Sequence, residues 1–475
     1  MDICFVTSEM LPFAATGGLG EVCGALAAML ARRGHRVRVI LPLYRQIDRE
    51  SLREILSFRV RLSWRDLECR CFTADYQGIT IYFLQNDAYF ARPALYGEYD
   101  DGERFAFLSS AALALLPHLG PPPEILHLND WHTALCLPYL RLVSRWDPYY
   151  RNIATVYTIH NMEYQGIYSP ELMGDLFGLG EEEGRELYHM GALNLTAGAI
   201  RLCDRLTTVS PGYAEELSDD RVSLGLGGVI STHRGKLTGI VNGIDEAEYD
   251  PRTGRDGIVP FDSSDLSGKA ENKAALQRRL GLPEEGNTPL LAMVTRLAAH
   301  KGIDLVLSAV DAMLERRMQL VVLGSGEGRY EHALRLLAER YPDRVRVIIG
   351  FDRPLSRAIY AGADLFLMPS LSEACGIAQM IASRYGALPL VHQTGGLRDT
   401  VEPYDRYRDT GDGFGFAPYS RDALLAVFHM ALDLYERERE RYDGIVRRAM
   451  RRDRGWERSA ERYEEVYRMA REGKG

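Results

Sequence analysis

Two cations follow a predicted strand in the second half of the chain. The segment VTRLAAHKG at 294–302 places Arg296 and Lys301 directly after the apolar run LLAMV. Two cations in such a position can hold a diphosphate and neutralise the negative charge that grows on a leaving group. The spacing is also compatible with a pair of surface cations, which is the usual position of Arg and Lys. The segment is therefore a candidate phosphate site with a plain structural alternative.

A carboxylate stands in the turn after another predicted strand. In PSLSEACGIAQMIASRYG at 369–386, the turn contains Glu373 and a helix is predicted to begin near Gly376. The first N–H groups of a helix lack partners and carry a partial positive charge, so they can bind a phosphate. Glu373 either interacts with that helix start or contacts a ligand, and local rules leave both alternatives open.

Polar residues also close two predicted strands in the first half. His160 and Asn161 end IATVYTIHN, and Asp130, Trp131 and His132 end ILHLNDWH. Ligands of parallel α/β sheets bind at the carboxyl ends of the strands, so these residues are binding candidates. A histidine whose hydrogen bonds are satisfied within the protein is the alternative.

Two glycine-rich loops each join a predicted strand to a predicted helix. ATGGLGE at 15–21 and LGSGEG at 323–328 match neither the dinucleotide fingerprint GxGxxG nor the GxxxxGK[ST] phosphate loop, so both of those sites are excluded. Their glycines still allow the backbone to approach a ligand closely.

The elements around these residues predict two parallel α/β sheets. The run ICFV, the loop at 15–21, a helix over 21–33 with one apolar stripe, and the run VRVIL form a βαβ unit. After residues 250–289, which are rich in Pro, Gly, Asp and Ser and suggest an inter-domain region, strands and helices alternate again. Two such domains would leave a cleft between their carboxyl edges for a nucleotide and a second substrate.

Composition excludes several classes of protein. The 475 residues carry 57 basic and 66 acidic side chains, a net charge of −9, which argues against nucleic acid or an anionic membrane as the partner. No apolar run reaches the ~18 residues of a membrane span, and no secretory leader is visible, so we expect a cytoplasmic protein. Seven cysteines without a CxxC pair disfavour a disulfide framework and a structural zinc site.

The motifs, taken in order, resemble the bacterial glycogen synthase and plant starch synthase family of retaining glucosyltransferases. The matching stretches extend from residue 1 to about 465 and are SEMLPFAATGGLGEVCGAL, YFARPALYG, HLNDWHTAL, TIHNMEYQGIY, TTVSPGYAEEL, GIVNGID, VTRLAAHKGIDL, SEACGIAQMIASRYGALPLV and TGGLRDTV. A series of long matches in order is far more specific than any single motif.

The resemblance implies a GT-B architecture of two Rossmann-like doubly wound domains with a cleft between them. The implied boundaries are an acceptor-side domain at 1–243, a nucleotide-sugar donor domain at 244–454 and a terminal helix at 455–475 that returns to the first domain. The implied reaction transfers glucose from ADP-glucose to the non-reducing 4-hydroxyl of an α-1,4-glucan with retention of configuration. It implies neither a metal nor another cofactor.

The resemblance also implies roles for individual residues. Arg296 and Lys301 look like the cations on the donor diphosphate, Glu373 like the carboxylate that holds the transferred glucose, and the main-chain carbonyl of His160 like the support of the reacting centre. The remaining implied contacts are Phe351 on the adenine; Gly17 and Gly18 on the diphosphate; Cys375, Gly376, Ile377 and Ala378 at the donor; and Asp130, Trp131, Asn161 and Asn242 at the sugar or acceptor.

The site shows one convincing carboxylate, Glu373, whereas most retaining glycosidases use two that are about 5–5.5 Å apart. A same-face displacement, in which an oxygen of the departing diphosphate helps to take the acceptor's proton, is therefore the mechanistic hypothesis. Four positions depart from the family pattern: Ala15 replaces a lysine, Glu21 an aspartate, Leu371 an arginine and Ala378 a threonine. The loss of one charged phosphate contact costs about 1.5–3 kcal/mol, which predicts a weaker or altered donor site. Two alternatives therefore stay open: a related retaining transferase with another nucleotide-sugar or acceptor, and a catalytically impaired glucan-binding or regulatory protein.

Overall fold

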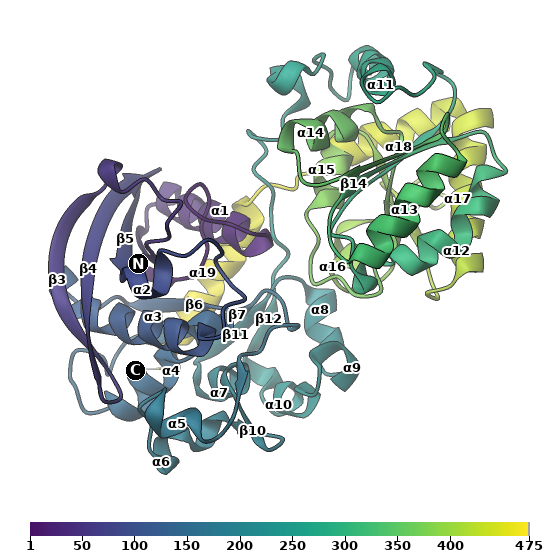
Figure 1. Ribbon diagram of the computed structural model, residues 1–475. Coiled ribbons are helices and arrows are strands. Elements are labelled where there is room, and N and C mark those ends of the chain that lie inside the picture. The colour runs from purple at the N-terminus through teal and green to yellow at the C-terminus, as the bar shows by residue number, and fades with distance from the viewer. Residues whose placement is uncertain (474–475) are drawn as a thin grey trace. The chain divides into compact units, whose positions relative to one another are not determined.

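The computed structural model describes residues 1–473, and the chain divides into two compact units. Met1–Asn242 and the segment that begins at Trp456 form the first unit, and Gly243–Gly455 forms the second (Figure 1). The chain therefore passes between the units twice, and a glycine stands at each crossing. Residues 250–289 lie inside the second unit, so the composition change there marks loops and a helix of that unit.

The first unit is built on a nine-stranded sheet in the order β12-β11-β7-β6-β1-β2-β5-β4-β3. All neighbours pair in parallel except at one end, where β4 is antiparallel to both β5 and β3. The strands are β1 (Asp2–Val6), β2 (Arg36–Pro42), β3 (Arg53–Leu62), β4 (Arg65–Tyr76), β5 (Ile79–Gln85), β6 (Ile125–Asn129), β7 (Ala154–Ile159), β11 (Arg205–Thr208) and β12 (Leu237–Gly239). Chain order reverses between β1 and β6, so the loops after these two strands lie side by side.

The predicted βαβ unit is present at the start of this sheet. The apolar run of β1 is buried, and β2 pairs with it in parallel, with Ile3 opposite Val37. Between them, α1 (Gly18–Arg32) buries Val22, Leu26 and Leu30, and its apolar stripe is why this segment is helical. The helix begins three residues before the predicted Glu21.

A helix from the far end of the chain completes the first unit. α19 (Glu457–Glu472) packs on β6, β7 and β11 and beside α1 (Figure 1). Tyr467 Oη lies 2.8 Å from His127 Nδ1 in the middle of β6, and Arg33 Nε donates to Glu464 Oε1 at 2.8 Å. The first hydrophobic core is thus made from both ends of the sequence.

The other elements of the first unit surround the sheet. A small sheet has the order β8-β10-β9. Its strands and the remaining helices are β8 (Ile167–Tyr168), β9 (Tyr188–His189), β10 (Ala192–Asn194), α2 (Asp87–Phe90), α3 (Asp101–Leu115), α4 (Cys136–Pro138), α5 (Leu172–Asp175), α6 (Glu181–Gly184), α7 (Leu195–Leu202), α8 (Pro211–Glu216), α9 (Asp220–Ser223) and α10 (Gly227–Thr232).

The second unit contains a six-stranded, wholly parallel sheet in the order β15-β14-β13-β16-β17-β18. By position in the unit this is the order 3-2-1-4-5-6 of a doubly wound dinucleotide-binding sheet, and chain order reverses between β13 and β16. The strands are β13 (Leu290–Val294), β14 (Gln319–Gly324), β15 (Val345–Ile349), β16 (Leu365–Met368), β17 (Leu388–His392) and β18 (Phe414–Phe416).

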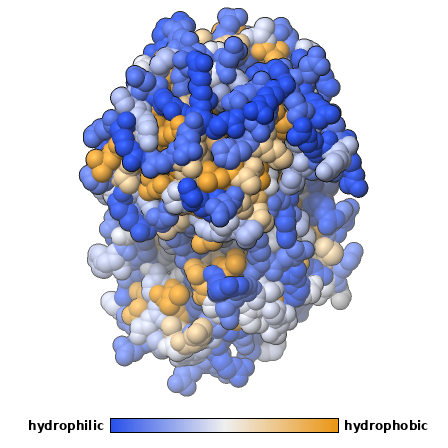
Figure 2. Space-filling view, turned by 90° about the vertical axis from the view of Figure 1, so that its right-hand side faces the viewer, coloured by the Kyte–Doolittle hydropathy of each residue, from blue (hydrophilic) through white to orange (hydrophobic). Residues whose placement is uncertain are grey.

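Helices flank this second sheet (Figure 1). They are α11 (Ser267–Arg279), α12 (Ile303–Leu314), α13 (Gly328–Arg340), α14 (Arg353–Gly362), α15 (Ala378–Arg384), α16 (Gly395–Thr400), α17 (Arg421–Arg437) and α18 (Arg439–Arg451). Within residues 1–473, no helix combines the length and the apolar composition that crossing a membrane requires. The face shown in Figure 2 is largely hydrophilic, with apolar residues in small separate groups.

Candidate active site

The strand order of the second unit places two functional loops side by side at the carboxyl edge of its sheet. One loop follows β13 and contains Lys301, and the other follows β16 and contains Glu373. Lys301 Nζ donates to Glu373 Oε2 at 2.6 Å, and Ser370 Oγ donates to the same oxygen at 3.1 Å. Because Glu373 is only 9% exposed, this ion pair compensates a nearly buried carboxylate and fixes its orientation.

A glycine allows the two loops to come this close. Gly302 follows Lys301 and has a φ of +75°, and a Cβ at this position would lie 2.0 Å from the carbonyl oxygen of Pro369. The loops are also joined by a backbone hydrogen bond of 2.8 Å from Leu371 N to His300 O. Only a residue without a side chain fits between them, and this explains the glycine in the HKG sequence.

The loop after Glu373 is held from behind by α15. Gln379 Nε2 donates to the carbonyls of Cys375 at 3.1 Å and Gly376 at 3.0 Å, and Gly376 has a left-handed φ of +73°. A Cβ on Gly396 would lie 2.3 Å from Cys375 Cα, so the Gly-Gly start of α16 packs directly on this loop. The helix begins at Ala378, two residues after the predicted start, because Gly376 is not helical.

Two further predicted residues stand at the same sheet edge. Arg296 follows β13 and is exposed, and it makes no ion pair or side-chain hydrogen bond with any residue of 1–473. Phe351 follows β15 and is 81% exposed, an unusual position for a large aromatic side chain. Both are therefore accessible to a ligand.

The glycines of the second glycine-rich loop, Gly324 and Gly326, approach the backbone of the loop after β13. A Cβ on Gly324 would lie 1.9 Å from a carbonyl oxygen of that loop, and a Cβ on Gly326 would lie 2.3 Å from another. Packing within the protein therefore explains why these two positions are glycine.

The carboxyl ends of β1 and β6 form the corresponding place in the first unit. Asp130 follows β6 and is buried, and its Oδ1 accepts a hydrogen bond of 2.7 Å from the backbone N–H of His160. Its backbone has φ 55° and ψ 178°, a region that is almost restricted to glycine and that marks stored strain. Burial raises the pKa of Asp130 to about 7, although the backbone N–H groups of His160 and Asn161 counteract the shift.

His160 is held at both its ring and its amide. His160 Nε2 lies 3.0 Å from Asn129 Oδ1, and the amide N–H is engaged by Asp130. Burial lowers the pKa of the imidazole to about 3, so the ring is neutral at pH 7. The residue is thus fixed in position, and its ring is not a proton donor near neutrality.

Glu9 is a functional candidate that the sequence reasoning missed. It follows β1 and is 3% exposed, and its carboxylate accepts hydrogen bonds from Thr16 N at 2.7 Å, Thr16 Oγ1 at 2.6 Å and Gly17 N at 3.4 Å. It therefore anchors the glycine-rich loop, whose Gly17 and Gly18 are exposed. The rule that singled out Asp130, a polar residue directly after a parallel strand, would have found Glu9 only if it were extended to the third residue after β1.

The other predicted residues of the first unit differ in accessibility. Trp131 is 8% exposed and its ring packs on His132 at 4.4 Å and on Phe105 at 5.3 Å, so it belongs largely to the core. Asn161 is partly exposed and its Oδ1 accepts from the N–H of Glu163. Asn242, the last residue of the first unit, has a buried Oδ1 without a hydrogen-bond partner among the described residues. An orphaned buried acceptor is costly unless a ligand or water completes it.

No group of three or more His, Cys, Asp or Glu side chains within 1–473 is placed to hold a metal ion. All seven cysteines are buried thiols. Ile377 and Ala378 are partly exposed beside Gly376, at the beginning of α15.

Comparison with known proteins identifies the two halves separately. The family model described as "Starch synthase catalytic domain" matches residues 2–232, and the model described as "Glycosyl transferases group 1" matches residues 277–446. The glycogen synthase of Bacillus cereus (strain B4264) is 42% identical over 479 residues, covering 99% of this chain and 100% of that protein. The glycogen synthase of Streptococcus mutans is 42% identical over 473 residues, covering 98% and 99%.

Solved structures agree. The catalytic domain of starch synthase IV from Arabidopsis thaliana, bound to ADP and acarbose, matches with a TM-score of 0.91 and 33% identity, covering 99% of both chains. Sucrose-phosphate synthase from Thermosynechococcus elongatus matches with a TM-score of 0.63 and 17% identity, a likeness of fold alone. These matches confirm the expected architecture of two doubly wound α/β domains. The chain belongs to the glycogen and starch synthase family.

Proposed function

We propose that this protein transfers glucose from ADP-glucose to the non-reducing 4-hydroxyl of an α-1,4-glucan with retention of configuration. The observation that carries the proposal is the Lys301–Glu373 ion pair, whose lysine shares the loop after β13 with the exposed Arg296, at the point where the strand order of the second sheet reverses. This is the position at which doubly wound sheets bind nucleotides.

The second unit supplies the donor contacts. Arg296 and Lys301 bind the diphosphate, and Glu373 binds hydroxyls of the transferred glucose. Phe351 stacks on the adenine, because an 81% exposed aromatic ring at the carboxyl edge has a free face to offer. The backbone from Cys375 through Gly376 and Ile377 to Ala378 approaches the donor, since Gly376 leaves this loop without a side chain at its turn.

The first unit supplies the contacts at the sugar and the acceptor. With the ring and the amide of His160 engaged, its main-chain carbonyl is the group that supports the reacting carbon. Asp130 and the orphaned Oδ1 of Asn242 offer buried acceptors for sugar hydroxyls, and Trp131 and Asn161 complete this side. The loop of Gly17 and Gly18, which Glu9 anchors, supplies backbone N–H groups to the diphosphate.

The reaction proceeds as a same-face displacement. The bond from the glucose C1 to the diphosphate oxygen breaks while the acceptor O4 forms a bond to C1 on the same face, and the hydroxyl proton passes to an oxygen of the departing diphosphate. Arg296 and Lys301 stabilise the charge of that leaving group. Glu373, whose Oε2 already accepts from Lys301 and Ser370, holds the sugar rather than attacking it.

The departures from the family pattern affect the affinity for the donor. Ala15 lies in the glycine-rich loop, and Leu371 and Ala378 flank Glu373 in sequence. Each replaces a side chain that could bind phosphate or sugar. We therefore expect that Ala15→Lys, which restores the lysine, lowers the Michaelis constant for the donor by up to about tenfold, the effect of one charged contact.

The test is nucleotide release from ADP-glucose, UDP-glucose and GDP-glucose, each with and without glycogen. Release from ADP-glucose that depends on glycogen supports the proposal, and α-1,4 linkage of the product confirms its stereochemistry. Glu373→Ala should nearly abolish release while leaving the fold intact, and the exposed Glu284→Ala serves as the matched control. Preference for another donor would replace the donor assignment, and glycogen binding without release from any donor would show an inactive glucan-binding protein.

A further inference from the structure

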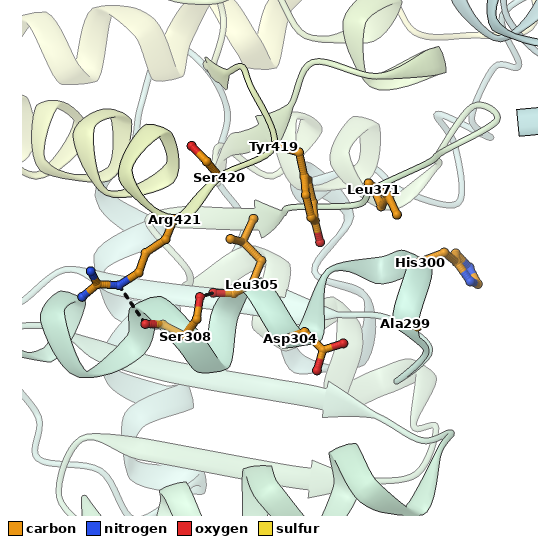
Figure 3. Close-up of a pocket in the computed structure, with 9 residues that line it drawn as sticks. All are labelled: Ala299, His300, Asp304, Leu305, Ser308, Leu371, Tyr419, Ser420 and Arg421. Carbon is orange, nitrogen blue, oxygen red and sulfur yellow. Dashed lines mark hydrogen bonds between the residues drawn. The ribbon is translucent and has the colours of Figure 1, made fainter. Parts of the chain in front are cut away.

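A hollow on the second unit adjoins the proposed donor loops at Ala299, His300 and Leu371, and its other lining residues lie outside the proposed donor and acceptor contacts. It has a volume of about 660 Å³, within the range of about 300–1,000 Å³ found for small-molecule sites. It lies over the first turns of α12, next to the chain that leads into α17 (Figure 3). Its lining residues are Ala299, His300, Asp304, Leu305, Ser308, Leu371, Tyr419, Ser420 and Arg421.

The hollow combines apolar surfaces with a polar margin. The ring of Tyr419 projects between Leu305 and Leu371, with its hydroxyl directed to the side of Asp304 (Figure 3). The ring packs edge to face on His392 at 5.1 Å, which fixes its orientation, and Leu371 is 53% exposed. An aromatic ring beside exposed aliphatic carbon suits the apolar face of a flat or chair-shaped ligand.

The margin carries hydrogen-bonding groups that are held in place. Arg421 Nε donates to Ser308 O at 2.9 Å, and Ser308 Oγ donates to Leu305 O at 2.7 Å (Figure 3). Asp304 is an exposed residue whose Oδ2 accepts from Tyr330 Oη at 2.5 Å, which leaves Oδ1 for a ligand. The other guanidinium nitrogens of Arg421 have no acceptor among residues 1–473. The margin thus offers both donors and acceptors.

The net charge of the lining residues distinguishes an anionic ligand from a neutral one. Among the lining residues, Asp304 is the single carboxylate and Arg421 the single guanidinium, and their charges cancel. A site for a phosphate or a nucleotide has surplus positive charge, as the Arg296 and Lys301 loop does. A neutral ligand with many hydroxyls and an apolar face fits this lining better, and a pyranose ring has both properties.

We propose that this hollow is a second glucan subsite, which binds a stretch of an α-1,4-glucan away from the reacting end. The proposal rests on the proposed function for the identity of the glucan. Tyr419 and Leu371 contact the apolar faces of the glucose units, and Asp304, Ser308 and Arg421 bind their hydroxyls. Its purpose is to raise the affinity for long acceptors, because a polymer held at two places dissociates more slowly than a short chain held at one.

The hollow also touches the loops of the donor site from outside. Ala299 and His300 directly precede Lys301, and Leu371 lies two residues before Glu373. The hydrogen bond from Leu371 N to His300 O joins the two loops at the wall of the hollow. A bound glucan therefore contacts the same two loops that position the Lys301–Glu373 ion pair.

The experiment compares Tyr419→Ala and Arg421→Ala with the control Tyr341→Ala. Tyr341 is a partly buried tyrosine of the same unit whose hydroxyl binds an aspartate, Asp311, but it precedes β15 at the amino edge of the sheet. The measurements are retardation in native gels that contain glycogen, and the KM values for glycogen, maltotriose and ADP-glucose. Thermal melting of each variant reports whether it is folded.

For both hollow variants we expect a KM for glycogen and a dissociation constant in the gel that rise about tenfold, with unchanged KM for maltotriose and ADP-glucose and unchanged kcat. Unchanged binding of glycogen, an equal rise for maltotriose, or the same effect in Tyr341→Ala would overturn the proposal. So would relief of glycogen retardation by inorganic phosphate, which would reveal an anion site. If the protein released no nucleotide from any donor, the gel measurement would still decide this proposal independently of the proposed function.

Discussion

Replacement of Lys301 by methionine tests the central ion pair. The change keeps the length of the side chain and removes the ammonium group that donates to Glu373 Oε2 at 2.6 Å. Within residues 1–473, Ser370 would then be the one side chain that still donates to Glu373, which would remain almost buried. We therefore expect the substitution to lower the free energy of unfolding, because it leaves a buried carboxylate without a compensating positive charge.

The magnitude follows from the exposure of the two side chains. Loss of one partner from a fully buried pair costs about 3–5 kcal/mol. Here the side chains of Lys301 and Glu373 are 15% and 10% exposed, so water reaches them in part and we expect a loss of about 2–3 kcal/mol in the free energy of unfolding. Activity should fall further, by about two to three orders of magnitude in kcat/KM, because the diphosphate also loses a cation.

A double-mutant cycle with Glu373→Gln measures the coupling directly. Urea unfolding of Lys301→Met, Glu373→Gln and the double variant should show a coupling energy of about 2 kcal/mol, since the double variant buries no unpaired charge. Lys301→Arg, which keeps the positive charge, should recover most of the stability but only part of kcat/KM, because a guanidinium has a different shape from an ammonium group. Additive effects on stability, or wild-type kcat/KM for Lys301→Met, would refute the reasoning.

Four further changes test other parts of the structure. Gly302→Ala should lower both the free energy of unfolding and kcat, because its Cβ would lie 2.0 Å from a carbonyl oxygen of the neighbouring loop. The control is Gly286→Ala, whose Cβ would meet nothing within 4 Å. Urea unfolding and an activity assay compare the two variants. Burial raises the pKa of Asp130 from 3.8 to about 7, so the folded state keeps a proton that the unfolded state loses. The free energy of unfolding should therefore fall as the pH rises from about 4 to 7. In Asp130→Asn, urea unfolding at pH 5 and pH 8 should show that this fall has disappeared. The hydrogen bond from the Arg33 guanidinium lowers the pKa of Glu464 from 4.5 to about 2, so the stability that ionised Glu464 contributes is complete above about pH 4.5 and is lost as the pH falls through about 2. Glu464→Gln should therefore lower the free energy of unfolding by about 1 kcal/mol at pH 7 and by clearly less at pH 3. Equal losses at the two pH values would contradict the assignment. Phe351→Ala should raise the KM for ADP-glucose about tenfold with little change in stability, because an 81% exposed side chain contributes little to the core, and an unchanged KM would remove the stacking role.

The sheets were predictable from the sequence because their strands are continuous apolar runs. The runs ICFV, VRVIL and LLAMV correspond to β1, β2 and β13, and the family and the two-domain architecture that the ordered motifs indicated are confirmed. The strands β12 (Leu237–Gly239) and β18 (Phe414–Phe416) were not predicted, because a run of three residues is too short to show a strand pattern.

The partners of individual side chains could not be predicted. Lys301 and Glu373 are 72 residues apart, and only the strand order brings them within 2.6 Å. Sequence also cannot tell whether a tryptophan after a strand faces solvent, and Trp131 turned out to be 8% exposed. Residues with polar character after parallel strands were found as candidates, but their actual contacts depend on tertiary packing.

The place of α19 in the first unit has a consequence for how the chain is made. A ribosome must synthesise the whole of Gly243–Gly455 before the helix that covers β6 and β7 emerges. Until then the face of the sheet that Tyr463 and Tyr467 cover is exposed to water and to other nascent chains. The second unit can complete its core first, so the amino-terminal half of this protein matures after the half that is translated later.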